Sequence, residues 1–271
     1  MKIRWIDTSC FEIETDQGKR IVTDPYIDEC SSSPVSSDDI GAMDYILISH
    51  THFDHISQLD KYFDLYRPKI LTGPLNGISL LRNLDLSGQC LYGMENGETL
   101  DFGDTRFLRL SGKHSIPGRK SRHLVRESDV IGEFKETFSL PDKYLSLMSE
   151  GFYEFSNYLI ETADNTRLLL WGGGVTHEQA EKARGLHPDI ILMQIPSNPP
   201  SMIAEFVRTC GASYVIPHHH DTYYGSRDVA AMISGIAEEI SSLSPWVKTI
   251  DPVPGHWYNF SKQLQDRKSV V

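Results

Sequence analysis

The chain has 271 residues, of which 39% are hydrophobic and 23% charged, and its net charge is −11 from 26 basic and 37 acidic residues. This acidic balance disfavours nucleic acid, whose binding needs clustered Lys and Arg, and no stretch reaches the roughly 18 apolar residues of a membrane span. The amino terminus has no signal-peptide run and the four cysteines form no CxxC pattern, so we expect a cytoplasmic protein.

The first half of the chain alternates short apolar strands with an amphipathic helix. The pattern predicts strands at 3–6, 10–14, 20–23, 45–48 and 69–72, a helix over 56–66, and a hairpin over 98–110 that turns at Gly103 and Asp104. Pro68 ends the helix because proline cannot continue it.

The second half repeats this alternation. We expect strands at 158–161, 167–171, 189–193, 213–216 and 257–260, and helices from about Thr176, over 200–210 and over 226–242. Two similar halves without a Pro/Gly/Ser linker predict an α/β layered fold, with a single domain over 1–271 built from two related units.

Residues 116–155 fit this alternation least well. They contain a basic cluster, Gly118 to His123, which is either a solvated loop or a clamp for one small anionic group. Apolar residues at helical spacing follow, and they predict either ordinary core or a lid insertion at 116–155 over a substrate cleft; they are Phe138, Leu140, Tyr144, Leu145, Leu147, Met148, Phe152 and Phe155.

A cluster of histidines follows the expected strand at 45–48. Residues 49–55 read Ser-His-Thr-His-Phe-Asp-His, and the alternation of an extended chain aims His50 and His52 the same way, while Asp54 and His55 enter the next turn. Imidazole and carboxylate together suit zinc, manganese or iron better than calcium or magnesium. The alternative is a polar turn that is histidine-rich by chance, which the close spacing of three histidines among 11 disfavours.

The run from Asp44 to His55 resembles the signature of the metallo-β-lactamase superfamily of hydrolases. The opening from Trp5 to Tyr26 resembles its lactonase-like branch, which includes L-ascorbate-6-phosphate lactonase. The resemblance implies a four-layer αβ/βα sandwich of the metallo-β-lactamase type, with the metal ions at the sheet edges and association into a homo-oligomer.

The resemblance also implies a set of metal ligands. His50 and His52 would hold one ion, Asp54 and His55 the other, and His114 matches the family's next histidine. For the last histidine the chain offers three candidates, His218, His219 and His220, and the family's proline-x-histidine spacing after Pro217 selects His219.

One position departs from the family pattern. The family places an aspartate that bridges the two metals where this chain has Gly173, within Trp171-Gly172-Gly173-Gly174. We therefore expect a second site that is weaker or served by another acid, with Asp221 and Glu178 nearest in sequence. The number of ions, one or two, and their identity, Zn or Mn with Fe as a further candidate, stay open.

The resemblance implies a metal-dependent hydrolase with a small-molecule substrate. It would direct a metal-bound hydroxide at a small ester, lactone or phosphodiester, with an anionic substrate as one candidate. Asp54 would orient the attacking water or take its proton, and Asp24 and Asp44 are candidates for fixing the imidazole tautomers. The alternative is a degenerate metal-binding sensor or binding module without hydrolytic activity, which the glycine at 173 motivates. A serine nucleophile is disfavoured because the chain has no Gly-x-Ser-x-Gly elbow.

Overall fold

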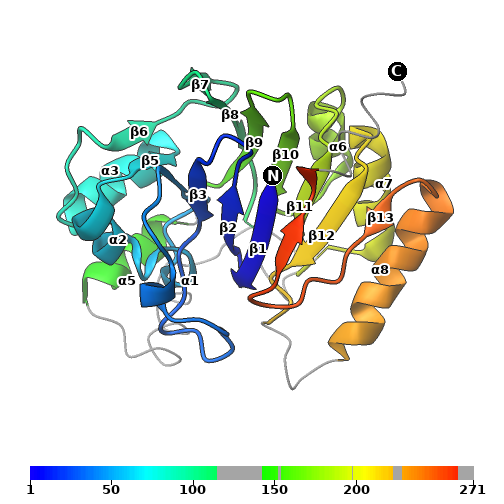
Figure 1. Cartoon of the computed structure of the whole chain (residues 1–271), viewed down its shortest axis with the longest axis horizontal. Coiled ribbons are helices and arrows are strands. Elements are labelled where there is room, and N and C mark those ends of the chain that lie inside the picture. Colours follow the sequence, from blue (N-terminus) through cyan, green and yellow to red (C-terminus); the bar gives the residue numbers. More distant parts are fainter. Residues whose placement is uncertain (115–141, 152–153, 197, 222–227, 262–271) are drawn as a thin grey trace.

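Two β-sheets packed face to face form the centre of the molecule, and helices cover their outer faces (Figure 1). The computed structural model describes residues 1–114, 142–151, 154–196, 198–221 and 228–261. Within those residues each sheet has seven strands.

The first sheet has the strand order β14-β1-β2-β3-β4-β5-β6. Its strands are β1 (Lys2–Asp7), β2 (Cys10–Glu14), β3 (Arg20–Thr23), β4 (Tyr45–Leu47), β5 (Lys69–Thr72), β6 (Leu91–Gly93) and β14 (Trp257–Asn259). Pairing is antiparallel from β14 to β3 and parallel from β3 to β6. It follows that β1, β3 and β4 run in the same direction, so the residues after them meet at one edge of the sheet.

The second sheet has the order β13-β12-β11-β10-β9-β8-β7. Its strands are β7 (Thr99–Asp101), β8 (Thr105–Ser111), β9 (Ser156–Thr162), β10 (Arg167–Trp171), β11 (Ile190–Gln194), β12 (Tyr214–His218) and β13 (Lys248–Thr249). The strands β10 to β13 are parallel, and β7 to β10 are antiparallel neighbours. The strands β8, β10 and β12 therefore also share one direction and one edge.

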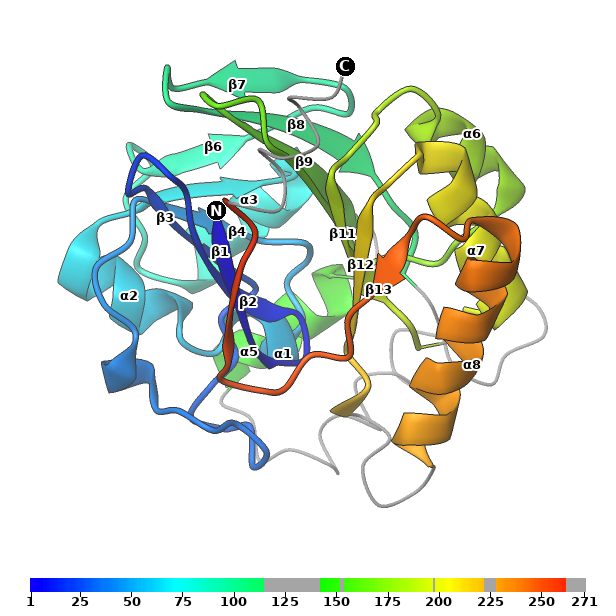
Figure 2. The same cartoon turned by 45° about the vertical axis from the view of Figure 1, so that its right-hand side comes forward.

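The helices form two outer layers, which Figure 2 shows on opposite sides of the sheets. One layer packs on the first sheet and holds α1 (Phe53–Ile56), α2 (Leu59–Tyr66), α3 (Pro74–Asn83) and α5 (Asp142–Glu150). The other packs on the second sheet and holds α6 (His177–Ala183), α7 (Pro200–Cys210) and α8 (Val229–Leu243); a short 3₁₀ turn, η1, spans Ser37–Asp39. The observed helix–sheet–sheet–helix order confirms the predicted αβ/βα sandwich.

Alternation along the strands explains why the layers form. Tyr45 and Leu47 of β4 lie in the core between the sheets, whereas Ile46 lies in the core under the helices. In β10, Leu168 and Leu170 face the first sheet and Leu169 faces the helices. Successive strand side chains point to opposite faces, and a sheet covered on both faces reads as a continuous apolar run.

Most of the strands and helices agree with the sequence-based expectations, and three of the differences have local causes. The helix expected over 56–66 is two pieces, α1 and α2. Helix α3 was not expected; Pro74 begins it, and Gly77 interrupts its apolar pattern. Strand β12 continues through Pro217 because its neighbour β13 pairs only with Tyr214 and Val215, so proline lies beyond the last pairing on that side.

The lid expected at 116–155 falls largely outside the described residues, and it stays a prediction. Its described part contains α5, which packs against α1 and α3. Tyr144, Leu147 and Met148 are buried in the core beneath that helix. For these residues the interpretation as ordinary core is the one that the structure supports. Among the described helices, none combines the length and the apolar content of a membrane span.

Candidate metal centre

The histidine-rich loop leaves the carboxyl end of β4 at the centre of the parallel part of the first sheet. His50, His52 and His55 are buried, each at most 2% exposed. The other two predicted ligands come from the second sheet, since His114 follows β8 and His219 follows β12. The structure thus brings all six predicted ligand residues to one edge of the sandwich, in two groups.

The first group consists of His50, His52 and His114, whose nearest ring nitrogens all lie within 4.8 Å of one another. The ring centroids are 4.3 to 4.8 Å apart. One nitrogen of His50 lies 2.9 Å from one of His52. Three imidazoles brought together in this way match the protein ligands of a catalytic zinc site, which has three of them and keeps a fourth position for water or substrate.

The second group consists of Asp54, His55 and His219, with their ligand atoms also within 4.8 Å of one another. The ring of His55 lies 4.1 Å from that of His50, centroid to centroid, so the two groups adjoin. Among the described residues, no group donates a hydrogen bond to the buried Oδ1 of Asp54. A buried carboxylate oxygen without a donor is costly, and a cation would remove that cost. The residues present therefore fit a metal ion.

The charge states of the imidazoles also fit this use. Burial, with neighbouring imidazoles, lowers the pKa of His50 and His52 well below its usual range, which keeps them neutral and able to bind a metal. Burial lowers the pKa of His219 to about 4. Burial also disfavours the charged form of His55, but the carboxylates of Asp54 and Asp24 outweigh it and raise its pKa.

Asp24 fixes the orientation of His55 and of the loop. Its Oδ2 accepts a hydrogen bond from His55 Nδ1 at 2.9 Å, and its two oxygens accept bonds from the backbone N–H and the hydroxyl of Ser49. Because Nδ1 carries the proton, Nε2 of His55 is left to face Asp54, 3.8 Å away. The geometry agrees with the role expected for Asp24.

The same expectation for Asp44 is wrong. This residue precedes β4, at the opposite end of the strand from the histidines. Its carboxylate accepts hydrogen bonds from the Lys19 side chain and the Arg20 backbone.

The three consecutive histidines after Pro217 have different surroundings. His218 is fully buried, with its ring edge-on to Phe11, and the His220 ring packs on Trp5. Only His219 belongs to one of the described ligand groups, and its backbone has a φ of +63°. The structure therefore favours the same histidine that the family spacing selects.

The backbone beside His114 explains why residue 173 is glycine. A Cβ atom on Gly173 would lie 2.9 Å from the carbonyl oxygen of Lys113 and 3.2 Å from its nitrogen. The N–H of Gly174 donates to that same carbonyl oxygen. An aspartate at 173 would need space that the chain leading to His114 already fills.

Neither acid proposed to replace that aspartate belongs to the two ligand groups. Glu178 is exposed and pairs with Lys182 one turn further along α6, so the described contacts do not support its candidacy. Asp221 instead accepts a hydrogen bond from the Thr8 hydroxyl, and it joins Asp7 and Cys30 in a third group of donor atoms. Sequence reasoning missed this group, although Asp7 ends an apolar strand at the same edge as Asp24 and that position was the signal.

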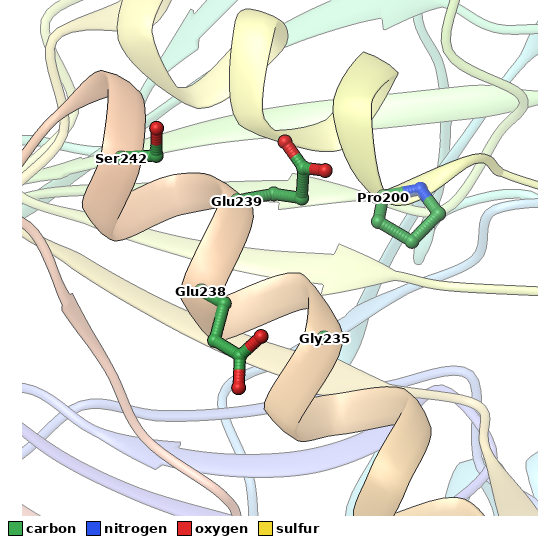
Figure 3. A pocket seen from close by; sticks show the side chains of 5 residues that line it. All are labelled: Pro200, Gly235, Glu238, Glu239 and Ser242. Carbon is green, nitrogen blue, oxygen red and sulfur yellow. The ribbon is translucent and has the colours of Figure 1, made fainter.

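The described residues also contain a hollow between α7 and α8 (Figure 3). It is lined by Pro200, Gly235, Glu238, Glu239 and Ser242. It shares no residue with either ligand group, so we do not count it as part of the candidate centre.

The sequence model described as "Beta-lactamase superfamily domain" matches residues 2–131, which include five of the six candidate ligands. A "UPF0173 metal-dependent hydrolase" of Methanobrevibacter smithii is 24% identical over 268 residues, covering 97% of this chain and 98% of that protein. The chain is therefore similar to the β-lactamase superfamily domain over residues 2–131 and, along nearly its whole length, to a metal-dependent hydrolase.

Solved structures show the metallo-β-lactamase fold over nearly the whole chain. Igni18, a metallo hydrolase from Ignicoccus hospitalis, superposes with a TM-score of 0.69 at 16% identity, covering 96% of this chain and 99% of that one. An isothiocyanate hydrolase from Delia radicum gut bacteria superposes with a TM-score of 0.64 at 13% identity, covering 96% and 100%. At these identities the likeness concerns the fold alone.

Proposed function

We propose that this protein is a metal-dependent hydrolase of the metallo-β-lactamase superfamily that cleaves a small ester, lactone or phosphodiester, as in the lactonase-like branch. The observation that carries the proposal is the meeting of two ligand groups, His50–His52–His114 and Asp54–His55–His219, at one edge of the sandwich. An anionic substrate is part of the proposal, although the basic cluster at 118–123 that motivates it lies outside the described residues. The four cysteines, all free thiols, support a cytoplasmic location.

The residues of the two ligand groups and Asp24 would have separate roles in the reaction. The three imidazoles of the first group would hold one zinc or manganese ion, and Asp54, His55 and His219 would hold a second. When bound, such an ion polarises the scissile group and lowers the pKa of a bound water to about 7. Asp54 would be the carboxylate that orients a water or takes its proton, while Asp24 holds the His55 ring in place.

The glycine at 173 bears on how many ions bind. Without a carboxylate at this position, nothing there neutralises two adjacent cations or fixes their separation. We therefore expect the two groups to fill at different metal concentrations. Metal analysis after stepwise dialysis, against zinc or manganese of increasing free concentration, measures this directly.

The proposal is tested by metal analysis of the purified protein, followed by an esterase, lactonase and phosphodiesterase screen. His52→Ala should lower any turnover by more than about 100-fold, since changes to residues that merely orient ligands already cost about 10–100-fold. His177→Ala is the matched control, because that side chain is exposed and pairs with Glu205. Absence of bound metal after growth in zinc or manganese would refute the proposed hydrolase.

A second candidate function is a metal sensor or binding module, which the glycine at 173 favours. It would bind metal through the same histidines and turn over none of the substrates. The screen separates the two, because turnover that is lost in His52→Ala excludes a purely binding role.

We also propose that the protein forms a homo-oligomer. Light scattering after size-exclusion chromatography measures its oligomeric state.

A further inference from the structure

The loop that carries His50 and His52 is held from one side by three described elements. These are α5, Gly151 and the stretch Glu154–Ser156, which together we call the buttress. The hydroxyl of Thr51 donates to the Leu147 carbonyl at 2.8 Å, and the N–H of Phe53 donates to the sulfur of Met148 at 2.8 Å. The N–H of Ser156 donates to the Ser49 carbonyl at 2.8 Å. The loop backbone is thus bonded to the buttress both before and after the two histidines.

Gly151 makes the closest approach to a candidate ligand. A Cβ atom at this position would lie 2.7 Å from Cδ2 of the His52 ring and 3.2 Å from the His52 nitrogen. Real Cβ atoms do not approach other atoms this closely, so the imidazole or the helix end would have to move. The backbone of Gly151 is not in the left-handed region. A side chain here would therefore act through contact with His52 and not through backbone strain.

Glu154 ties the buttress to both halves of the molecule. Its carboxylate accepts hydrogen bonds from the Asn76 backbone, in the first turn of α3, and from Arg109 of β8. Arg109 also donates to the Ser156 hydroxyl at 2.7 Å. The side chains of Arg109 and Glu154 are 4% and 11% exposed, and a buried pair with this many hydrogen bonds holds its members in one geometry.

Phe155 fills the space behind the first ligand group. Its ring centroid lies 4.8 Å from that of His50 and 6.0 Å from that of His114. Two glycines make room for the ring, since Cβ atoms on Gly112 and Gly172 would come within 2.8 and 3.0 Å of its carbons. The ring has little freedom to shift, and neither do the imidazoles packed on it.

We propose that the buttress is a positioning element for the first ligand group, in which Gly151 sets the place of the His52 ring and Phe155 that of His50 and His114. The inference rests on the proposed function, because it assumes that these histidines bind metal. No buttress residue has to touch substrate for this role. The buttress acts by holding the ligands in a geometry that an ion can use without further reorganisation.

The test compares Gly151→Ala with Gly235→Ala. Gly235 lies in α8, where a Cβ atom would meet nothing within 4 Å, so this substitution controls for the change of residue type. The first measurement is the histidine ¹⁵N NMR spectrum of the metal-free protein, in which Gly151→Ala should shift the His52 ring signals and Gly235→Ala should not. The second is zinc affinity by chelator competition, which should weaken by about 10–100-fold in Gly151→Ala only. The visible absorption of the cobalt-loaded protein should change in the same variant.

Phe155→Leu keeps the test decisive if Gly151→Ala does not fold. It should shift the ring signals of His50 and His114 and weaken zinc binding. Unchanged signals and affinity in a folded Gly151→Ala or Phe155→Leu protein would overturn the positioning role. If the wild-type protein binds no zinc, cobalt or manganese, the proposed function fails, while the spectra of the metal-free variants still decide whether the buttress places the rings.

Discussion

Two non-glycine residues of the candidate centre have left-handed backbones, Asp24 with φ of +38° and His219 with φ of +63°. For an L-residue this conformation costs on the order of 1 kcal/mol. At Asp24 it accompanies three hydrogen bonds to Ser49 and His55, and at His219 it accompanies the grouping with Asp54. Such strain is found where a side chain must be held in one place. Both residues come directly after a strand. This position was predicted for Asp24, which follows the expected strand at 20–23, whereas neither φ value could be read from the sequence.

The carboxyl group of Asp7, in the third group of donor atoms, should make the free energy of unfolding depend on pH. Burial and the nearby carboxylate of Asp221 raise the pKa of Asp7 to about 6, from 3.8. A carboxyl group whose pKa is raised on folding stabilises the protein fully below its unfolded pKa, and this contribution is lost as the pH rises through about 6. Asp7→Asn removes the buried charge, so we expect it to raise the free energy of unfolding at pH 8 by about 1–2 kcal/mol.

The measurement is urea unfolding with a chelator present, at pH 8 and at pH 4. At pH 4 the wild-type carboxyl is already protonated, so Asp7→Asn should change little. Asp64→Asn serves as the control, because that carboxylate is 72% exposed and pairs only with Arg67 among the described residues. Destabilisation of Asp7→Asn at pH 8 would contradict the sign of this argument.

Among the elements, those with a strong apolar period were predictable and those held by tertiary contacts were not. The strands β4, β10 and β11 are continuous apolar runs, and their position in the sequence already gave the layered fold. The short strands β6 and β13 have no such pattern, since they owe their pairing to the neighbours β5 and β12.

The candidate centre also has a part that could be predicted from the sequence and a part that could not. The ligand residues could be predicted, because each of them lies in a short motif that is read over a few neighbouring residues. The buttress could not be predicted, because its contacts join residues about 100 positions apart in the sequence, such as Thr51 and Leu147.

The turn after β10 allows a test of whether the fold has room for an aspartate at residue 173. Gly173→Asp would restore the residue type that the superfamily places there, yet its Cβ atom would meet the Lys113 backbone at 2.9 Å. We therefore expect no gain in metal binding and a loss of about 1–3 kcal/mol of stability, as overpacking typically costs. Gly88→Asp is the control, since its Cβ atom would meet nothing within 4 Å. Urea unfolding and metal analysis measure the two effects; a stable Gly173→Asp protein that gains a second tightly bound ion would show that the backbone of Lys113 can yield.

Viewed over the whole molecule, both ligand groups draw on both sheets. The first joins His50 and His52, which follow β4, to His114, which follows β8. The second joins Asp54 and His55 to His219, which follows β12. A bound ion would therefore link the two halves of the sandwich, and its binding free energy would add to the stability of their association.

This arrangement predicts a stability that depends on metal concentration. An ion that binds only the folded chain raises the free energy of unfolding by about 2.7 kcal/mol when its free concentration is 100 times its Kd. We expect the Tm of the wild-type protein to rise with zinc or manganese and to fall on chelation. His114→Ala removes the second sheet's share of the first group and leaves only His50 and His52 there. The part of the rise in Tm that comes from an ion at the first group should therefore disappear. His256→Ala should respond as the wild type does, since that residue belongs to neither group. A Tm that is the same with metal and with chelator would show that the ligand groups do not bind an ion that ties the two sheets together.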